Sequence, residues 1–136
     1  MKNYLISNLL MTLLLIGFIS LSACKGPTDT IQIDGSVWFR ERLALPPDAK
    51  LKVQLLDVSK MDVAAEVLAE TVLDVQSVPR AFSLTVMADK YINGHSYAVA
   101  ARITQGDSLL FINTQRYSVD LLKPSEIKLK LDKVAR

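Results

Sequence analysis

The chain contains very few of the residues from which catalytic and metal sites are built. Its 136 residues include one cysteine, Cys24, and one histidine, His95. One cysteine excludes an internal disulfide, and these two residues cannot supply the nitrogen and sulfur ligands of a zinc site. A Ser-His-Asp triad would have to use His95, which follows Asn93-Gly94, a turn in which we expect a solvated side chain. We therefore expect no enzyme, no catalytic residue and no metal.

Glycine is also scarce, and charge of one sign is not in excess. The five glycines form no phosphate-binding loop, so no cofactor is expected. Sixteen basic and fourteen acidic residues give a net charge of +2 without a basic run, which excludes the charged face that nucleic acids require. Glu66 and Glu70 would lie about 13 Å apart on a strand, too far for a glycosidase pair.

One long hydrophobic run is present, at the N-terminus. Lys2 precedes an almost unbroken apolar segment from Leu5 to Leu21, and the small residues Ser22-Ala23 follow it. This order is typical of a cleaved signal peptide. A retained membrane helix over Tyr4 to Ala23 is the alternative, because such helices need about 20 apolar residues. No basic stop-transfer cluster follows the segment, which favours the signal peptide.

The segment Leu21-Ser22-Ala23-Cys24 has the form of a bacterial lipobox. We expect residues 1–23 to be a lipoprotein signal peptide, Cys24 to carry diacylglycerol and palmitate, and residues 24–30 to form a lipidated tether. The alternative is that Cys24 is a free buried thiol. One acyl chain gives only reversible attachment, whereas the three chains of a bacterial lipoprotein would hold permanently. Because Lys25 stands where inner-membrane lipoproteins carry Asp, the resemblance to bacterial lipoproteins implies an anchor in the outer membrane that faces the periplasm.

Removing residues 1–23 from the 136-residue chain leaves 113 residues, enough for one domain with a single core. Through most of this part apolar and polar residues alternate with a period of two, which predicts strands. The expected strands occupy residues 31–42, 51–58, 64–75, 82–86, 97–104, 108–112 and 127–132. Short strands separated by turns predict an all-β, seven-stranded antiparallel β-sandwich over residues 31–133.

Three local features of this pattern lead to specific expectations. Residues 64–75 fit a helix or a strand, and their β-branched side chains favour a strand. The alternation slips at Leu55-Leu56, which indicates a bulge or a strand end. The turn at Gly106-Asp107 predicts a hairpin, whose register would place Leu110 opposite Ile103.

Two motifs carry a resemblance to a known family. Residues 35–49 read GSVWFRERLALPPDA and residues 53–59 read VQLLDVS, and the stretches 97–103 and 110–114 match in kind. These segments resemble the YbaY-type lipoproteins, which are grouped with the YscW-type type III secretion lipoprotein chaperones, or pilotins. The resemblance covers about residues 31–131. It implies a small β-sandwich lipoprotein of the outer membrane.

Pilotins bind the C-terminal segment of a secretin and help it to assemble in the outer membrane. The Leu-Pro-Pro-Asp-Ala sequence at residues 45–49 points to the YbaY-like branch, for which a secretin client is not implied. The match transfers no partner-binding residue, so the binding surface stays open at this point.

Two functions follow from these features. The first is a non-enzymatic binding or chaperone module for an envelope protein, with a secretin as a candidate, in which an apolar groove accepts an amphipathic peptide or a strand. The alternative is a structural or stress-related envelope lipoprotein that contacts cell-wall or surface polysaccharide through Trp38, Tyr91 and Tyr117. An enzyme ranks third. The partners expected are thus a membrane, through Cys24, and an envelope protein, but no nucleic acid.

Overall fold

The computed structural model describes residues 29–135. The expected signal peptide and Cys24 lie outside these residues. The elements, in order, are β1 (Thr30–Trp38), β2 (Lys50–Asp57), β3 (Glu66–Asp74), β4 (Arg80–Met87), the short 3₁₀ turn η1 (Ala88–Lys90), β5 (Tyr97–Gln105), β6 (Ser108–Ile112), β7 (Tyr117–Val119), β8 (Ile127–Lys130) and β9 (Asp132–Lys133). In the described part of the chain, no helix is long and apolar enough to span a membrane.

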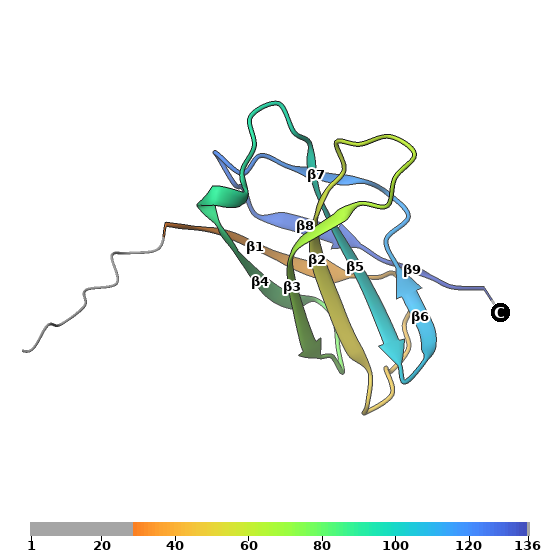
Figure 1. The fold of residues 1–136 in the computed structure, drawn as a ribbon. Coiled ribbons are helices and arrows are strands. Elements are labelled where there is room, and N and C mark those ends of the chain that lie inside the picture. Colours follow the sequence, from red (N-terminus) through yellow and green to blue (C-terminus); the bar gives the residue numbers. More distant parts are fainter. Residues whose placement is uncertain (1–28, 136) are drawn as a thin grey trace, which may run out of the picture.

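The strands form two sheets that pack face to face (Figure 1). One sheet has the order β4-β1-β8, and the other has the order β3-β2-β5-β6-β9 with β7 paired to β5. All neighbours are antiparallel except β1 and β8, which are parallel. The predicted all-β sandwich is confirmed, and the one parallel pair is the exception to the antiparallel prediction.

The strand count is nine, so the prediction of seven was wrong. β7 has three residues and β9 has two, which is too short for a period of two to be visible in the sequence. The count also rises because one expected strand is divided between the two sheets. The single strand expected over residues 127–132 pairs first with β1 and then, beyond Leu131, with β6, so that it closes one side of the sandwich.

The core lies between the sheets and follows the predicted alternation. Its apolar side chains come from alternate positions of the central strands, and each buried Leu, Ile, Val or Phe contributes roughly 1.5–3 kcal/mol by leaving water. The most deeply buried include Ile33, Val37, Leu51, Val53, Leu55, Leu84, Val99, Ile103, Phe111, Leu129 and Leu131. Within residues 29–135 no polar or charged residue is fully buried.

The ambiguous segment is a strand, as predicted, with β3 covering Glu66–Asp74. The slip at Leu55-Leu56 coincides with a bulge in the pairing of β2 with β3. Leu55 pairs with Ala69 and Leu56 with Val67, so the extra residue, Leu68, lies on β3.

The hairpin prediction was right at the turn and wrong beyond it. Gln105 pairs with Ser108, but Leu110 is bulged out, so that Ile103 faces Phe111. Phe111 therefore turns into the core, where its ring stacks on that of Phe39 with centroids 4.2 Å apart. Burial of this aromatic pair stabilises the fold more than an unbroken ladder of hydrogen bonds would. The resulting bulge leaves Leu110 only half-buried.

Gly35, the first residue of the family-like motif, is required by packing. A Cβ at this position would collide with the carbonyl oxygen of Ile127 and lie 2.6 Å from Cζ of Phe82. Glycine thus lets β8 approach β1 while the Phe82 ring crosses over the strand.

Candidate docking groove

An apolar groove opens between the loop that joins β1 to β2, strand β6 and the chain after β9. It has a volume of about 730 Å³. In Figure 1 the loop after β1 descends beside β6 and β9. The lining residues are Leu43, Ala44, Leu45, Pro46, Leu109, Leu110, Phe111, Lys133, Val134 and Ala135. This volume lies within the range of small-ligand sites, roughly 300–1,000 Å³.

The β1–β2 loop forms one wall of the groove and is held in place by the Leu-Pro-Pro-Asp-Ala motif. Leu45 is buried against the core, and the backbone N–H of Ala49 donates to the carbonyl of Pro46 over 3.0 Å. The side-chain amide of Gln105 donates to Asp48 Oδ1 over 2.9 Å, which ties the loop to β5. Leu43 stays 38% exposed at the groove mouth.

The opposite wall depends on the bulge in β6. Since Phe111 turns inward, Leu110 is left beside the opening, and its carbonyl accepts a hydrogen bond from Val134 N at 3.0 Å. This bond draws residues 134 and 135 along β6. The bulge that the alternation did not reveal is thus what forms this side of the groove.

Charge at the groove is sparse and positive. Lys133 is the charged residue of the lining. The neighbouring Asp132 accepts hydrogen bonds from Lys130 Nζ and Thr114 Oγ1, both over 2.6 Å. These bonds, above all that from Lys130, hold the pKa of Asp132 below its usual value, so this carboxylate stays ionised and is paired with Lys130. Lys133 is therefore the positive charge that the lining presents.

The groove lies far from the point where the described chain begins. β1 starts at Thr30 and ends at Trp38, just before the groove-forming loop. Nine residues in a strand extend about 30 Å, and Figure 1 shows the two ends of β1 on opposite sides of the molecule.

The lone histidine takes part in a hydrogen-bonded cluster and is not the solvated turn residue that the sequence indicated. His95 Nδ1 lies 2.5 Å from Asp57 Oδ2, and the side chain of His95 is only 29% exposed. Ser59 donates to Asp57 Oδ1 from its hydroxyl over 2.5 Å and from its backbone N–H over 2.9 Å. Ser96 N donates to Ser59 Oγ over 2.8 Å.

This cluster contains the residue types of a catalytic triad in a different arrangement. In a triad the serine hydroxyl donates to the histidine, whereas the Ser59 hydroxyl donates to Asp57 directly. The contacts join the loop after β2 to the loop before β5, a structural role. The Ser59 hydroxyl bond, assisted by His95, lowers the pKa of Asp57 from its usual 3.8 to about 2.

The cluster predicts an acid-dependent loss of stability. Because the pKa of Asp57 is lower in the folded chain, its stabilising effect is complete above pH 4 and is lost as the pH falls towards 2. We expect Asp57→Asn to flatten the fall of the unfolding free energy between pH 4 and pH 2, measured by urea denaturation. Asp74→Asn is the control, because that carboxylate is 73% exposed and water screens its ion pair with Lys50. Equal flattening by both variants would contradict this assignment.

The three aromatic residues considered for polysaccharide contact are not freely exposed. Trp38, Tyr91 and Tyr117 are each half-buried. Tyr91 packs against Tyr97 with ring centroids 6.1 Å apart, and the Tyr117 hydroxyl accepts the backbone N–H of Lys130 over 2.9 Å. Within residues 29–135 no three or more His, Cys, Asp or Glu side chains are grouped to hold a metal ion.

Residues 29–135 form a β-sandwich with an apolar groove, an arrangement suited to binding. Residues 28–132 match the family described as "Type III secretion system lipoprotein chaperone (YscW)". The chain belongs to this YscW family of lipoprotein chaperones, and the predicted resemblance is confirmed.

Two relatives agree with this placement. The chain is 36% identical over 97 residues to the "Uncharacterized lipoprotein YbaY" of Escherichia coli (strain K12), which covers 68% of this chain and 50% of the relative. The chain thus spans about half the length of that relative. A solved structure, "Structure of an alternative pilotin from the type II secretion system of Vibrio cholerae", is 35% identical with a TM-score of 0.74. The match covers 79% of this chain and all of that one.

The sequence had indicated none of the groove residues as a binding site. They come from three segments far apart in the chain, around residues 43–46, 109–111 and 133–135. The signal that could have pointed to them is the Leu-Pro-Pro-Asp-Ala motif, since two prolines within a conformationally restricted loop fix the wall on which the groove depends.

Proposed function

We propose that this chain is a lipoprotein anchored through Cys24 in the outer membrane, facing the periplasm, and that it docks a segment of an envelope protein without catalysing a reaction. The groove carries this proposal. It is preformed, apolar and bounded by backbone hydrogen bonds on both sides. Membership of a lipoprotein chaperone family supports the same function.

The residues that line the groove indicate what kind of segment would bind in it. Leu43, Leu109 and Leu110 offer apolar contacts along the opening, and Lys133 offers one positive charge. A short amphipathic segment with a few apolar side chains and an adjacent carboxylate satisfies both features. The volume accommodates a few side chains rather than a whole domain. The likeness to a type II secretion pilotin makes the C-terminal segment of a secretin one candidate for this occupant.

The position of the proposed anchor is compatible with docking in the groove. Cys24 lies five residues before Asp29 in the sequence, and β1 then carries the chain away towards the groove. A module tethered at one end and open at the other would present its groove to proteins in the periplasm.

We expect Leu43→Lys in the full-length lipoprotein to reduce recovery of its envelope partner about tenfold, because a charge at the groove mouth must be desolvated when an apolar segment docks. Recovery is measured by quantitative mass spectrometry of proteins co-purified from detergent-solubilised membranes. Ile112→Lys is the matched control, since Leu43 and Ile112 are 38% and 37% exposed and Ile112 does not line the groove. If the two variants retain the same proteins in equal amounts, the groove is not the docking site.

A further inference from the structure

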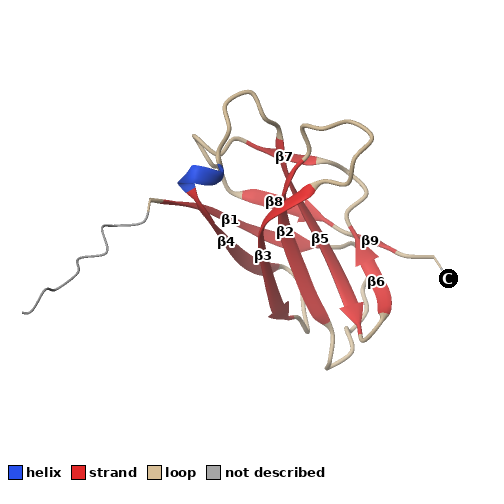
Figure 2. Ribbon diagram, viewed as in Figure 1, coloured by secondary structure: helices blue, strands red, loops and turns tan. Residues whose placement is uncertain are grey.

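A second apolar surface lies at the opposite end of the sandwich, where the described chain begins. Three large side chains are exposed there: Met87 and Ile92 at 50% each, and Leu122 at 70%. Met87 ends β4, directly before η1, and pairs in register with Thr30. Figure 2 shows η1 beside the point where the chain enters β1. We call Met87, Ile92 and Leu122 the entry tips.

The entry tips belong to one surface. Ala88 N donates to the carbonyl of Asp29 over 2.9 Å, which fixes the start of η1 to the chain entry. A shallow pocket runs between Tyr91 to Tyr97 on one side and Ser118 to Leu121 on the other, so the loops that carry Ile92 and Leu122 adjoin.

The loops hold these side chains outward by hydrogen bonds of their backbones. Ile92 N donates to the Tyr97 hydroxyl over 2.7 Å, and this phenol lies 3.3 Å from the Ile92 carbonyl. Leu122 N donates to Asp120 Oδ1 over 2.9 Å, and Lys123 N to the Asp120 carbonyl over 3.3 Å. Because these hydrogen bonds fix the backbone of both loops, Ile92 and Leu122 stay exposed. Exposed apolar side chains gathered in one place are typical of a contact site for a protein or a membrane.

We infer that the entry tips rest in the headgroup region of the membrane that holds the lipid anchor. This inference depends on the proposed lipidation of Cys24. Asp29 is the fifth residue after Cys24, and a chain spans at most about 3.5 Å per residue, so the entry lies within about 17 Å of the anchored cysteine. A tether of this length would hold the end of the domain that carries the tips close to the bilayer.

The charge near the entry tips favours apolar insertion over electrostatic attraction. Lys90 and Lys123 are offset by Asp29, Asp89 and Asp120, so this end carries no positive excess for anionic lipids. Large side chains that enter the interface bind by burial of their apolar surface. The contact is therefore expected to persist at high salt and on vesicles without anionic lipid.

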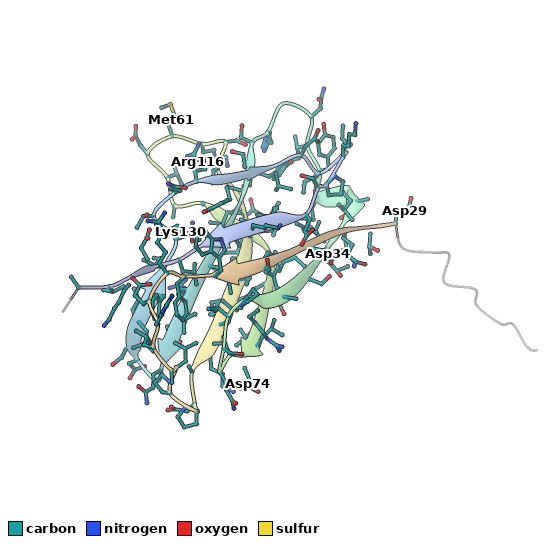
Figure 3. The ribbon with its side chains drawn as sticks, turned by 180° about the vertical axis from the view of Figure 1, so that it is seen from behind. Asp29, Asp34, Met61, Asp74, Arg116 and Lys130 are labelled. Atoms are coloured by element: carbon teal, nitrogen blue, oxygen red, sulfur yellow. The ribbon has the colours of Figure 1, made fainter. Side chains whose placement is uncertain are left out.

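The experiment uses the full-length lipoprotein, purified from membranes and reconstituted in vesicles of phosphatidylethanolamine and phosphatidylglycerol. Leu122→Cys and, separately, Ile92→Cys are labelled with an environment-sensitive fluorophore, and quenching by nitroxide-labelled lipids is measured. Met61→Cys is the control, because Met61 is 89% exposed and lies on the side of the molecule away from Asp29 (Figure 3). The wild-type chain shows whether Cys24 itself accepts the label.

We expect an unlabelled wild type, about twofold quenching at positions 122 and 92, and little quenching at position 61. Equal quenching at the three positions, or loss of quenching at positions 122 and 92 in 1 M salt, would overturn the inference while leaving the anchor and the groove intact. Labelling of the wild type at Cys24 would instead mean that this cysteine carries no lipid. That result would overturn both this inference and the membrane attachment in the proposed function.

Discussion

Replacement of Phe111 by alanine is expected to lower the free energy of unfolding by about 3–5 kcal/mol. The ring is 2% exposed, stacks on Phe39 and lines the base of the groove. Its removal takes away both its buried apolar surface and its aromatic partner, and leaves a cavity. Urea denaturation followed by the fluorescence of Trp38, the only tryptophan, measures the change.

Ile112→Ala is the matched control for this prediction. Ile112 is the next residue on β6, but it is 37% exposed and faces away from the core, so we expect a loss below about 1 kcal/mol. A loss for Ile112→Ala as large as that for Phe111→Ala, or larger, would contradict the inward position of Phe111 that the bulge at Leu110 produces.

Cys24→Ser is expected to move the chain from the envelope fraction to the soluble periplasm or to leave it as an uncleaved precursor. A serine oxygen cannot receive the thioether-linked lipid, and without acyl chains the module has no permanent hold on a bilayer. Density-gradient fractionation combined with the mass of the N-terminal peptide separates these outcomes.

Ser22→Ala keeps a small side chain before the cysteine and is the control for the Cys24 variant, with an expected mass and fractionation like those of the wild type. A cleaved Cys24→Ser chain that still sedimented with the outer membrane would contradict lipid anchoring at this residue.

The sequence predicted the strands well because burial on one face imposes a period of two. The alternation at residues 31–38, 51–55 and 97–103 recurs as β1, β2 and β5 with the expected faces buried. The turn at Gly94 is confirmed with a φ of 83°, and that at Gly106 with a φ of 53°. Glycine adopts this conformation at little cost, so such local signals transfer directly to structure.

The same local signals did not reveal features that depend on residues distant in the chain. The Leu110 bulge follows from the fit of Phe111 against Phe39, 72 positions away in the sequence. The contact of His95 with Asp57 joins the loop before β5 to the end of β2, which only strand pairing brings together. Likewise, only the folded chain shows that Gly35 is needed to admit β8.

The candidate groove shows this limit most clearly. Its apolar residues have no shared period, because they come from a loop, a bulged strand and the segment after β9. Leu109 and Leu110 look like two more core residues of a hairpin until the bulge separates them. The motif at residues 45–49 indicated only the family resemblance, and the structure shows that its loop forms one wall of the groove.

The most direct test of groove docking is site-specific photo-crosslinking in intact cells that produce the full-length lipoprotein. A photoreactive amino acid replaces Leu43 in one strain and Ile112 in another. We expect position 43 to form an adduct with one envelope protein, whose crosslinked peptide is a short amphipathic segment with an acidic residue, and position 112 to form none. Adducts of equal yield at both positions, or an adduct at position 43 with polysaccharide or lipid alone, would contradict docking of a protein segment in the groove.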